Sequence, residues 1–253
     1  MVFIVFVQIF GVSGVTYYES HRYFRLIHFG FLSFYSIFCF FTIVSYWNSV
    51  RTCPGFIGKN QENNLNEEDV KAGKSFCELC KCVKEANVKH CYTCERCVVN
   101  KSHHCQWINN CVGKYNHKFF LLFLVYSCIW VGFTIGINSR IVYEICREKY
   151  DKEQIVPIVL SVYTFIVTII FFTYCVRVLF DQILTINDKK KYFKSDSRSF
   201  CLSLKDIFGK GSKFCWFFPL LFITNDNTSV APKNSSKYII EKIENTSFTH
   251  QTL

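Results

Sequence analysis

The sequence predicts an all-α membrane protein, in which four transmembrane helices flank a cytosolic, zinc-stabilised cysteine-rich domain between the second and third helix. Three observations predict this fold class. Of the 253 residues 50% are hydrophobic, and they gather in long blocks that lack a soluble amphipathic pattern. Positive charge lies mainly between and after these blocks. A dense run of Cys and His residues falls between the second and third block.

Four apolar blocks predict the transmembrane helices, arranged as two hairpins. They span residues 2–18, 24–47, 119–138 and 155–180. The last three approach the roughly 20 residues that cross a hydrocarbon core. For the first block, Val2–Tyr18, a signal peptide is the alternative, but the block lacks a basic start and a convincing cleavage site. We therefore interpret it as a first span.

The distribution of Lys and Arg predicts the orientation. Eleven lie between the second and third block, and twelve lie at the end of the fourth block and after it, counting Arg177. The connection Arg140–Gln154 holds four basic and four acidic residues. Because positive residues stay on the cytosolic side, both termini and the cysteine-rich segment are expected in the cytosol. The net charge of +10 fits such topology signals and anionic lipid, and we expect no nucleic-acid partner.

These features divide the chain into four parts. Residues 1–52 form the first hairpin, and residues 53–118 form a cytosolic linker and the zinc domain, with its core at 77–118. Residues 119–180 form the second hairpin, and residues 181–253 form a cytosolic tail. From Thr224 the tail is rich in Asn, Ser and Thr, which predicts disorder. The sequence shows no evident internal repeat.

The cysteine-rich segment predicts metal binding. The chain has 15 cysteines, and thiolate and metal chemistry suits the cytosol better than a disulfide framework. A C-x-x-C turn points two sulfur atoms at one point in space, which suits a tetrahedral zinc ion. Cys77-x-x-Cys80 and Cys91-x-x-Cys94 are two such turns. Further ligand candidates lie close by: His90, Cys97, His103, His104, Cys105 and Cys111.

The segment offers more Cys and His side chains than two tetrahedral sites use. A thiol left over beside an imidazole is a candidate nucleophile and base. In an extended segment His103 and His104 point to opposite faces, so one can bind zinc while the other faces Cys105. Zinc and a histidine nearby would lower the thiol pKa of Cys105. The alternative, that Cys105 is one more structural cysteine, stays open on spacing alone, and Cys82 is read as a surface or packing cysteine.

These residues resemble the cysteine-rich domain of the DHHC protein S-acyltransferases, the palmitoyltransferases. The pattern is Cys77-x2-Cys80, His90-Cys91-x2-Cys94-x2-Cys97, Ser102-His103-His104-Cys105, Cys111, Asn116 and Phe120. The arrangement of two spans, a cytosolic loop, two spans and a cytosolic tail also fits. Cys53-Pro54-Gly55 is similar to the family's Asp-Pro-Gly motif, and residues 203–219, with Trp216 and Pro219, are similar to its C-terminal amphipathic motif.

The resemblance implies two structural Zn²⁺ ions and an acyl-enzyme. Cys105 would attack the thioester of a long-chain acyl-CoA such as palmitoyl-CoA, with His103 as general base, and pass the acyl group to a cysteine of a substrate protein at the cytosolic membrane face. The expected location is an integral multi-pass protein of the ER or Golgi membrane. The implied ligands are Cys77, Cys80, His90 and Cys97 for one zinc, and Cys91, Cys94, His104 and Cys111 for the other.

Three positions depart from the family pattern. Ser102 stands where the family has Asp, so the charged form of His103 would be less stabilised. Gln106 replaces a Pro, and Leu184-Thr185-Ile186-Asn187 keeps one Thr of a Thr-Thr-x-Glu motif. The alternative function is therefore a weakly active or inactive relative that acts as a membrane zinc scaffold or acyl-CoA binder. A RING-type ubiquitin ligase is disfavoured by the short gaps between ligands.

Overall fold

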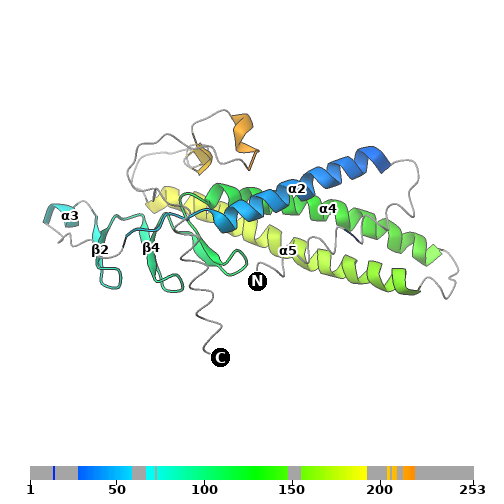
Figure 1. Ribbon diagram of the computed structural model, residues 1–253, viewed down its shortest axis with the longest axis horizontal. Helices are drawn as coiled ribbons and strands as arrows, with labels where there is room; N and C mark the ends of the chain where they lie inside the picture. The colour runs from blue at the N-terminus through cyan, green and yellow to red at the C-terminus, as the bar shows by residue number, and fades with distance from the viewer. Residues whose placement is uncertain are drawn as a thin grey trace, which may run out of the picture.

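The computed structural model describes residues 14, 28–58, 67–71, 73–147, 155–192, 204–205, 207–209 and 213–219. In these ranges three long helices lie side by side, and short hairpins lie beyond one end of them (Figure 1). The helices are α2 (His28–Arg51), α4 (His117–Arg147) and α5 (Ile155–Tyr192). Helix α4 packs against both α2 and α5. The predicted first span lies outside the described residues, apart from Gly14.

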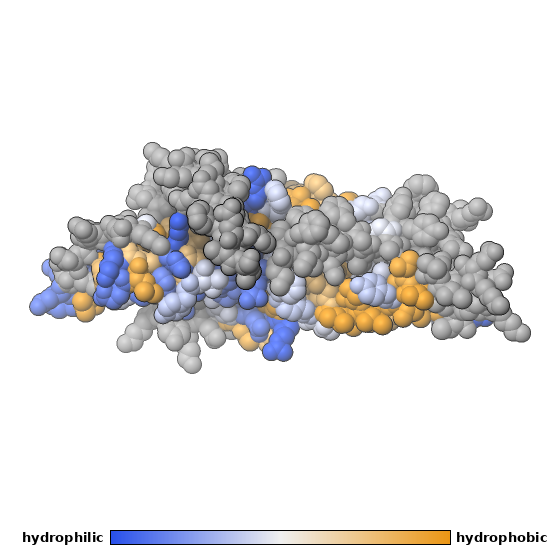
Figure 2. Space-filling model, turned by 60° about the horizontal axis from the view of Figure 1, so that its bottom comes forward, coloured by the Kyte–Doolittle hydropathy of each residue, from blue (hydrophilic) through white to orange (hydrophobic). Residues whose placement is uncertain are grey.

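Two of the described helices are long and apolar enough to cross a membrane. These stretches are His117–Arg140 on α4 and Val159–Ile186 on α5. The α5 stretch is only 22% buried, so most of its apolar surface faces outward. Figure 2 shows hydrophobic side chains gathered on the surface of the helical part, away from the hairpins. An apolar surface of this size fits contact with lipid, so these helices indicate a membrane protein.

Helix α2 coincides with most of the predicted second span but is not among the two membrane candidates. Buried hydroxyl groups on it donate to carbonyls one turn back, Thr42 to Phe38 and Ser49 to Ser45 at 2.8 Å each. Such bonds satisfy polar side chains within the helix itself. Because only α4 and α5 qualify as membrane candidates among the described residues, the four-span arrangement stays a prediction.

The cysteine-rich segment consists of three antiparallel two-stranded hairpins in the described part of the chain. Each loop ends on a residue with positive φ: Lys81 at 50°, Glu95 at 51° and Asn109 at 45°. A left-handed residue at this point closes a short hairpin loop. The prediction of an all-α fold thus holds for the long helices only. The hairpins pair β1 (Ser75–Cys77) with β2 (Cys82–Lys84), β3 (Val88–Cys91) with β4 (Arg96–Val99), and β5 (His103–Cys105) with β6 (Asn110–Val112).

The three hairpins repeat one local structure. Cys77 pairs with Cys82, Cys91 with Arg96, and Cys105 with Asn110, each as the last pair before the loop. The pair before it is Phe76–Val83 in the first hairpin, His90–Cys97 in the second and His104–Cys111 in the third. Equivalent positions follow at equal intervals along the chain. The sequence reading, which found no internal repeat, was wrong on this point.

Buried asparagines join the third hairpin to the C-terminal end of α2. The amide of Asn110 donates to the carbonyls of Val50 and Thr52 at 3.2 and 3.1 Å. The amide of Asn116 donates to Ser49 O at 3.3 Å and Cys111 O at 2.7 Å, while its oxygen accepts from Gly113 N at 2.9 Å. The last carbonyls of a helix lack intrahelical donors, so these bonds satisfy the end of α2.

The segment after α2 runs along the second hairpin. Gly55 O accepts from Val99 N and Ile57 N donates to Cys97 O, both at 2.9 Å. Gly113 lies against this segment so closely that a Cβ there would be 2.4 Å from Pro54 O. The Cys53-Pro54-Gly55 sequence thus fixes the hairpins to the helices through close backbone contact.

The described part of the C-terminal segment lies on α2 and α4. Helix η2 (Lys213–Trp216) is followed by Pro219, whose carbonyl accepts from the Asn48 amide at 2.6 Å. Lys118 donates to Cys215 O at 3.2 Å, and Trp216 donates to Gly209 O at 3.1 Å. The short helix α3 (Glu67–Lys71) precedes the hairpins.

Candidate active site and metal centres

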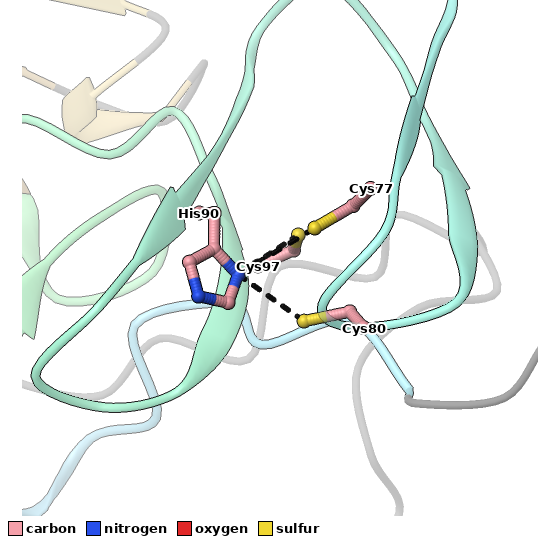
Figure 3. Close-up of side chains that lie close together, drawn as sticks. All are labelled: Cys77, Cys80, His90 and Cys97. Atoms are coloured by element: carbon pink, nitrogen blue, oxygen red, sulfur yellow. Dashed lines mark hydrogen bonds between the residues drawn. The ribbon is translucent and has the colours of Figure 1, made fainter.

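Four side chains from the first two hairpins form the first Cys/His cluster (Figure 3). Cys77 and Cys80 come from the first hairpin, while His90 and Cys97 are a cross-strand pair of the second. The His90 Nδ1 atom lies 3.6, 3.3 and 3.8 Å from the sulfur atoms of Cys77, Cys80 and Cys97. Three of the four residues are buried.

The second cluster has the same architecture one hairpin further along the chain. Cys91 ends β3 and Cys94 lies in the loop of the second hairpin, while His104 pairs with Cys111 in the third. The His104 Nδ1 atom lies 3.7, 3.3 and 3.7 Å from the sulfur atoms of Cys91, Cys94 and Cys111. Hydrogen bonding from Cys111 is the largest cause that lowers the pKa of Cys94, to about 5. A thiolate, the form that binds metal, therefore forms readily there.

The donor sets and their spacing fit zinc. All ligand atoms within each cluster lie within 4.8 Å of one another. A tetrahedral zinc with Zn–S bonds of about 2.3 Å and Zn–N bonds of about 2.0–2.1 Å places its ligand atoms roughly 3.5–3.8 Å apart. Three thiols and one imidazole form a closed structural set. The two clusters can therefore each hold a metal ion, and they contain the eight residues that the resemblance implied.

Cys82 belongs to neither cluster although it is fully buried. It is 0% exposed and packs with Cys77, Cys97 and Val88. Burial is the main cause that raises the pKa of its thiol, which favours the neutral form. Of the two sequence interpretations, a packing cysteine rather than a surface cysteine fits this environment.

Strand β5 separates His104 from its two neighbours. Adjacent strand residues point to opposite faces, and residues two apart share a face. His104 points into the second cluster, so His103 and Cys105 lie together on the other face of β5. The structure therefore brings the predicted base and nucleophile to one face and leaves Cys105 outside both clusters.

Cys105 is buried at the junction of the third hairpin and the helices. It is 6% exposed and shares an apolar cluster with Tyr46, Ile108, Phe120 and Phe123. Burial raises the pKa of its thiol, and hydrogen bonds from the backbone of Ile108 and Trp107 offset part of this rise. Among the protein's own groups, burial outweighs these donors; the lowering of this pKa that the sequence predicted depends in part on zinc and stays a prediction. Proton removal by a nearby base is therefore needed for attack.

His103 is suited to accept that proton. Burial is the largest cause that lowers its pKa, followed by the charges of His104 and Lys101. A neutral imidazole has one free nitrogen, which can act as a base. The His103 ring also meets the Phe120 ring edge-on, with centroids 5.4 Å apart. This contact restricts the orientation of the imidazole.

Ser102 contacts His103 and Gln182, and Gln182 in turn contacts His117; neither Gln182 nor His117 was expected at the site from the sequence. Its Oγ lies 3.3 Å from His103 Nδ1 and donates to Gln182 Oε1 at 3.1 Å. The same Gln182 oxygen lies 3.2 Å from Nε2 of His117, the first residue of α4. Gln182 and His117 are 4% and 2% exposed. The network therefore connects the hairpin to both α4 and α5.

The contact of α5 with the site comes from Gln182, two residues before the segment that resembles the Thr-Thr-x-Glu motif. The Thr185 hydroxyl donates to the Asp181 carbonyl of its own helix at 2.8 Å. Asp181, the neighbour of Gln182, is exposed, and the Asp188 side chain lies outside the described residues. A polar residue at the end of an apolar span is the sequence signal that marks Gln182.

Tyr46 is a further residue that sequence reasoning missed. It lies on α2, is 0% exposed, and donates through its hydroxyl to Trp107 O at 2.9 Å. Trp107 is one of the two residues whose backbone is bonded to the Cys105 sulfur. Tyr46 therefore holds the loop that surrounds Cys105.

Comparison with known proteins places this site in a described family. The profile of the DHHC palmitoyltransferase family matches residues 70–195. Palmitoyltransferase pfa3 of Aspergillus fumigatus is 48% identical over 88 residues, which cover 34% of this chain and 16% of that protein. Palmitoyltransferase ZDHHC15 of Xenopus laevis is 34% identical over 135 residues, covering 41% of this chain and 40% of that protein.

A longer match extends over most of the chain. Palmitoyltransferase ZDHHC15A of Danio rerio is 29% identical over 195 residues, which cover 72% of this chain and 59% of that protein. The chain thus spans between 16% and 59% of the length of these curated relatives. The profile match over residues 70–195 includes the hairpins, where the two clusters and Cys105 lie.

Proposed function

Since this chain belongs to the DHHC palmitoyltransferase family, we propose that it is a protein S-acyltransferase that works through an acyl-Cys105 intermediate. The acyl donor is a long-chain acyl-CoA such as palmitoyl-CoA. The acceptor is a cysteine of a substrate protein at the cytosolic membrane face.

One observation carries this proposal. Cys105 lies outside both metal clusters and on the same face of β5 as His103, while His104 is turned into the second cluster. A thiol beside a neutral imidazole is the arrangement of a nucleophile and its base. A cysteine with a purely structural role would have no need of this neighbour.

The reaction takes place in two thioester exchanges. His103 accepts the thiol proton while Cys105 Sγ attacks the carbonyl carbon of acyl-CoA, and the proton goes to the leaving CoA sulfur. The thiol of a substrate protein then attacks the acyl-Cys105 carbonyl, and His103 transfers that proton to the Cys105 sulfur. Each step forms one C–S bond and breaks another, so no energy input is needed.

The two clusters are proposed as structural zinc sites. Their ligands would be the four residues of each cluster, all supplied by the protein, with no open position for substrate. Zinc bound there supplies folding energy, because a hairpin domain this small has little apolar core. As a ligand of the second cluster, His104 would fix strand β5, which also carries His103 and Cys105.

We further propose four membrane spans, with both termini and the hairpins in the cytosol. The apolar surface of α4 and α5 supports insertion of the second helical hairpin. Each buried CH₂ of an acyl chain contributes about 0.8 kcal/mol, so binding between spans would favour long chains. The cysteine at the helix–hairpin junction then meets both the soluble CoA group and lipid-apposed proteins. The family resemblance implies an ER or Golgi membrane, which we propose as the location.

A second candidate is a weakly active relative that binds acyl-CoA or acts as a membrane scaffold. Ser102 favours it, because a neutral hydroxyl stabilises an imidazolium less than a carboxylate does. Hydroxylamine-sensitive labelling of the full-length protein with a palmitoyl-CoA analogue separates the two candidates. We expect labelling of wild type and its loss in Cys105→Ser. Equal labelling of both proteins would refute the nucleophile, and no labelling of either would favour the scaffold.

A further inference from the structure

The amide oxygen of Gln182 is the meeting point of two donors from distant parts of the chain. Ser102 Oγ lies 3.1 Å from it and His117 Nε2 lies 3.2 Å from it. We infer that Gln182 is a positioning residue that sets the tautomer of His103 through Ser102. This inference rests on the proposed role of His103 as base.

The direction of these hydrogen bonds follows from their chemistry. An amide oxygen has lone pairs and no proton, so both Ser102 and His117 donate to it. The single proton of the Ser102 hydroxyl is then committed to Gln182. Its oxygen can only accept from His103 Nδ1, which lies 3.3 Å away. His103 therefore keeps its proton on Nδ1 and leaves Nε2 free.

The free Nε2 atom is what a base needs. A hydroxyl without Gln182 could turn and donate to His103 Nδ1 instead. The neutral imidazole would then carry its proton on Nε2, where it cannot accept one from Cys105. A carboxylate at position 102 would exclude this state because it can only accept. Gln182 provides the same selection for a serine.

Burial makes the selection effective. Gln182 is 4% exposed and His117 is 2% exposed, so water competes little for their polar atoms. A buried acceptor without donors costs more than a typical hydrogen bond provides, which holds the amide in place. His117 begins α4, and Gln182 lies on α5, so both helices fix the position of the oxygen.

Paired substitutions of Gln182 test this role in the full-length, zinc-loaded protein. Gln182→Met keeps the size and removes the acceptor, while Gln182→Glu keeps an acceptor at both terminal atoms. The measured quantities are the maximal rate of Cys105 acylation and the palmitoyl-CoA concentration that gives half that rate. Asp181→Asn is the matched control, because Asp181 is the exposed neighbour on the same helix.

We expect Gln182→Met to lower the maximal rate about tenfold, with the half-saturating concentration within about twofold of wild type. Gln182→Glu and Asp181→Asn should stay within about twofold of wild type in both quantities. Ser102→Ala with Gln182→Met should be no slower than Ser102→Ala alone. A wild-type rate in Gln182→Met, or multiplied losses in the double variant, would overturn the inference.

The tautomer itself gives a readout that does not depend on activity. In ¹⁵N spectra of histidine-labelled protein, assigned with His103→Gln, the wild type should show His103 protonated on Nδ1 only. Gln182→Met should show a mixture of the two tautomers. If the wild type fails to acylate, but the His103 tautomer still changes between the wild type and Gln182→Met, the proposed function fails and the positioning role stands. An unchanged tautomer in Gln182→Met overturns the positioning role.

Discussion

Cys105 takes, in the third hairpin, the position that Cys91 takes in the second, at the last strand pair before the loop. Cys94 follows Cys91 within the loop of the second hairpin, whereas Ile108 stands at the equivalent place after Cys105. Ile108 is fully buried in the apolar cluster that contains Cys105. One local structure thus serves metal binding in one hairpin and leaves a single thiol in the next.

Alanine substitutions at these two equivalent positions should have opposite consequences. Cys91→Ala removes one ligand from a closed set, so we expect zinc to fall from about two to about one per chain and the melting temperature to fall. Cys105→Ala should keep both zinc ions and lose acylation. Zinc analysis and thermal unfolding of the purified protein measure this. Loss of zinc in Cys105→Ala would contradict the assignment of Cys105 as a non-ligand.

Tyr46→Phe tests the contact between α2 and the loop beside Cys105. The change removes the hydroxyl that donates to Trp107 O and keeps the buried ring. We expect the acylation rate to fall about three- to tenfold and stability to fall by about 1 kcal/mol. Tyr143→Phe is the control, because that ring is 50% exposed on α4. Equal rates in wild type and Tyr46→Phe would show that this bond is dispensable.

The sequence was sufficient for the parts of the site that are local in the chain. Zinc ligands cluster in a short segment, so their spacing constrains which side chains can meet. The extended conformation of His103 and His104 also followed from neighbouring positions. The hairpin repeat is only partial in the sequence: Cys77, Cys91 and Cys105 recur at equivalent positions, but their strand partners are Cys82, Arg96 and Asn110.

Contacts between distant segments could not be read from spacing. Ser102 and Gln182 are 80 positions apart, and Tyr46 and Trp107 are 61 apart. Neither Gln182 nor Tyr46 lies in a pattern that points to a partner. Their roles arise from how α2, α4 and α5 pack around the third hairpin, which depends on tertiary structure.

Ser102→Asp tests whether the missing charge limits the base. A carboxylate would accept a charge-assisted hydrogen bond from His103 Nδ1. Without the Ser102 hydroxyl donating to it, the Gln182 amide can turn its NH₂ group to the carboxylate, with His117 Nε2 unprotonated in its other tautomer. We expect the acylation rate to rise about tenfold. Ser102→Asn has a similar shape without the charge and should give no gain. If Ser102→Asp is no faster than wild type, the neutral network already suffices.

Gly113→Ala tests the close contact between the hairpins and the segment after α2. An added Cβ would lie 2.4 Å from Pro54 O and 2.8 Å from Val98 Cγ1, so backbone has to move. We expect a loss of about 1–3 kcal/mol in stability, seen as a lower melting temperature. Gly136→Ala on α4 is the control, since its Cβ would meet nothing within 4 Å. Similar melting of both variants would exclude a tight junction.

Glycosylation mapping tests the proposed topology. The connection after α4, residues 148–154, should face the lumen, because charged residues there show no basic excess, unlike the segments expected in the cytosol. A flexible insertion with an Asn-x-Thr sequon after Lys149 should therefore be glycosylated in cells. The natural sequons at Asn227, Asn234 and Asn245 should stay unmodified in the same protein and serve as the internal control. Modification of the natural sequons and not of the insertion would reverse the orientation and place Cys105 on the side without acyl-CoA.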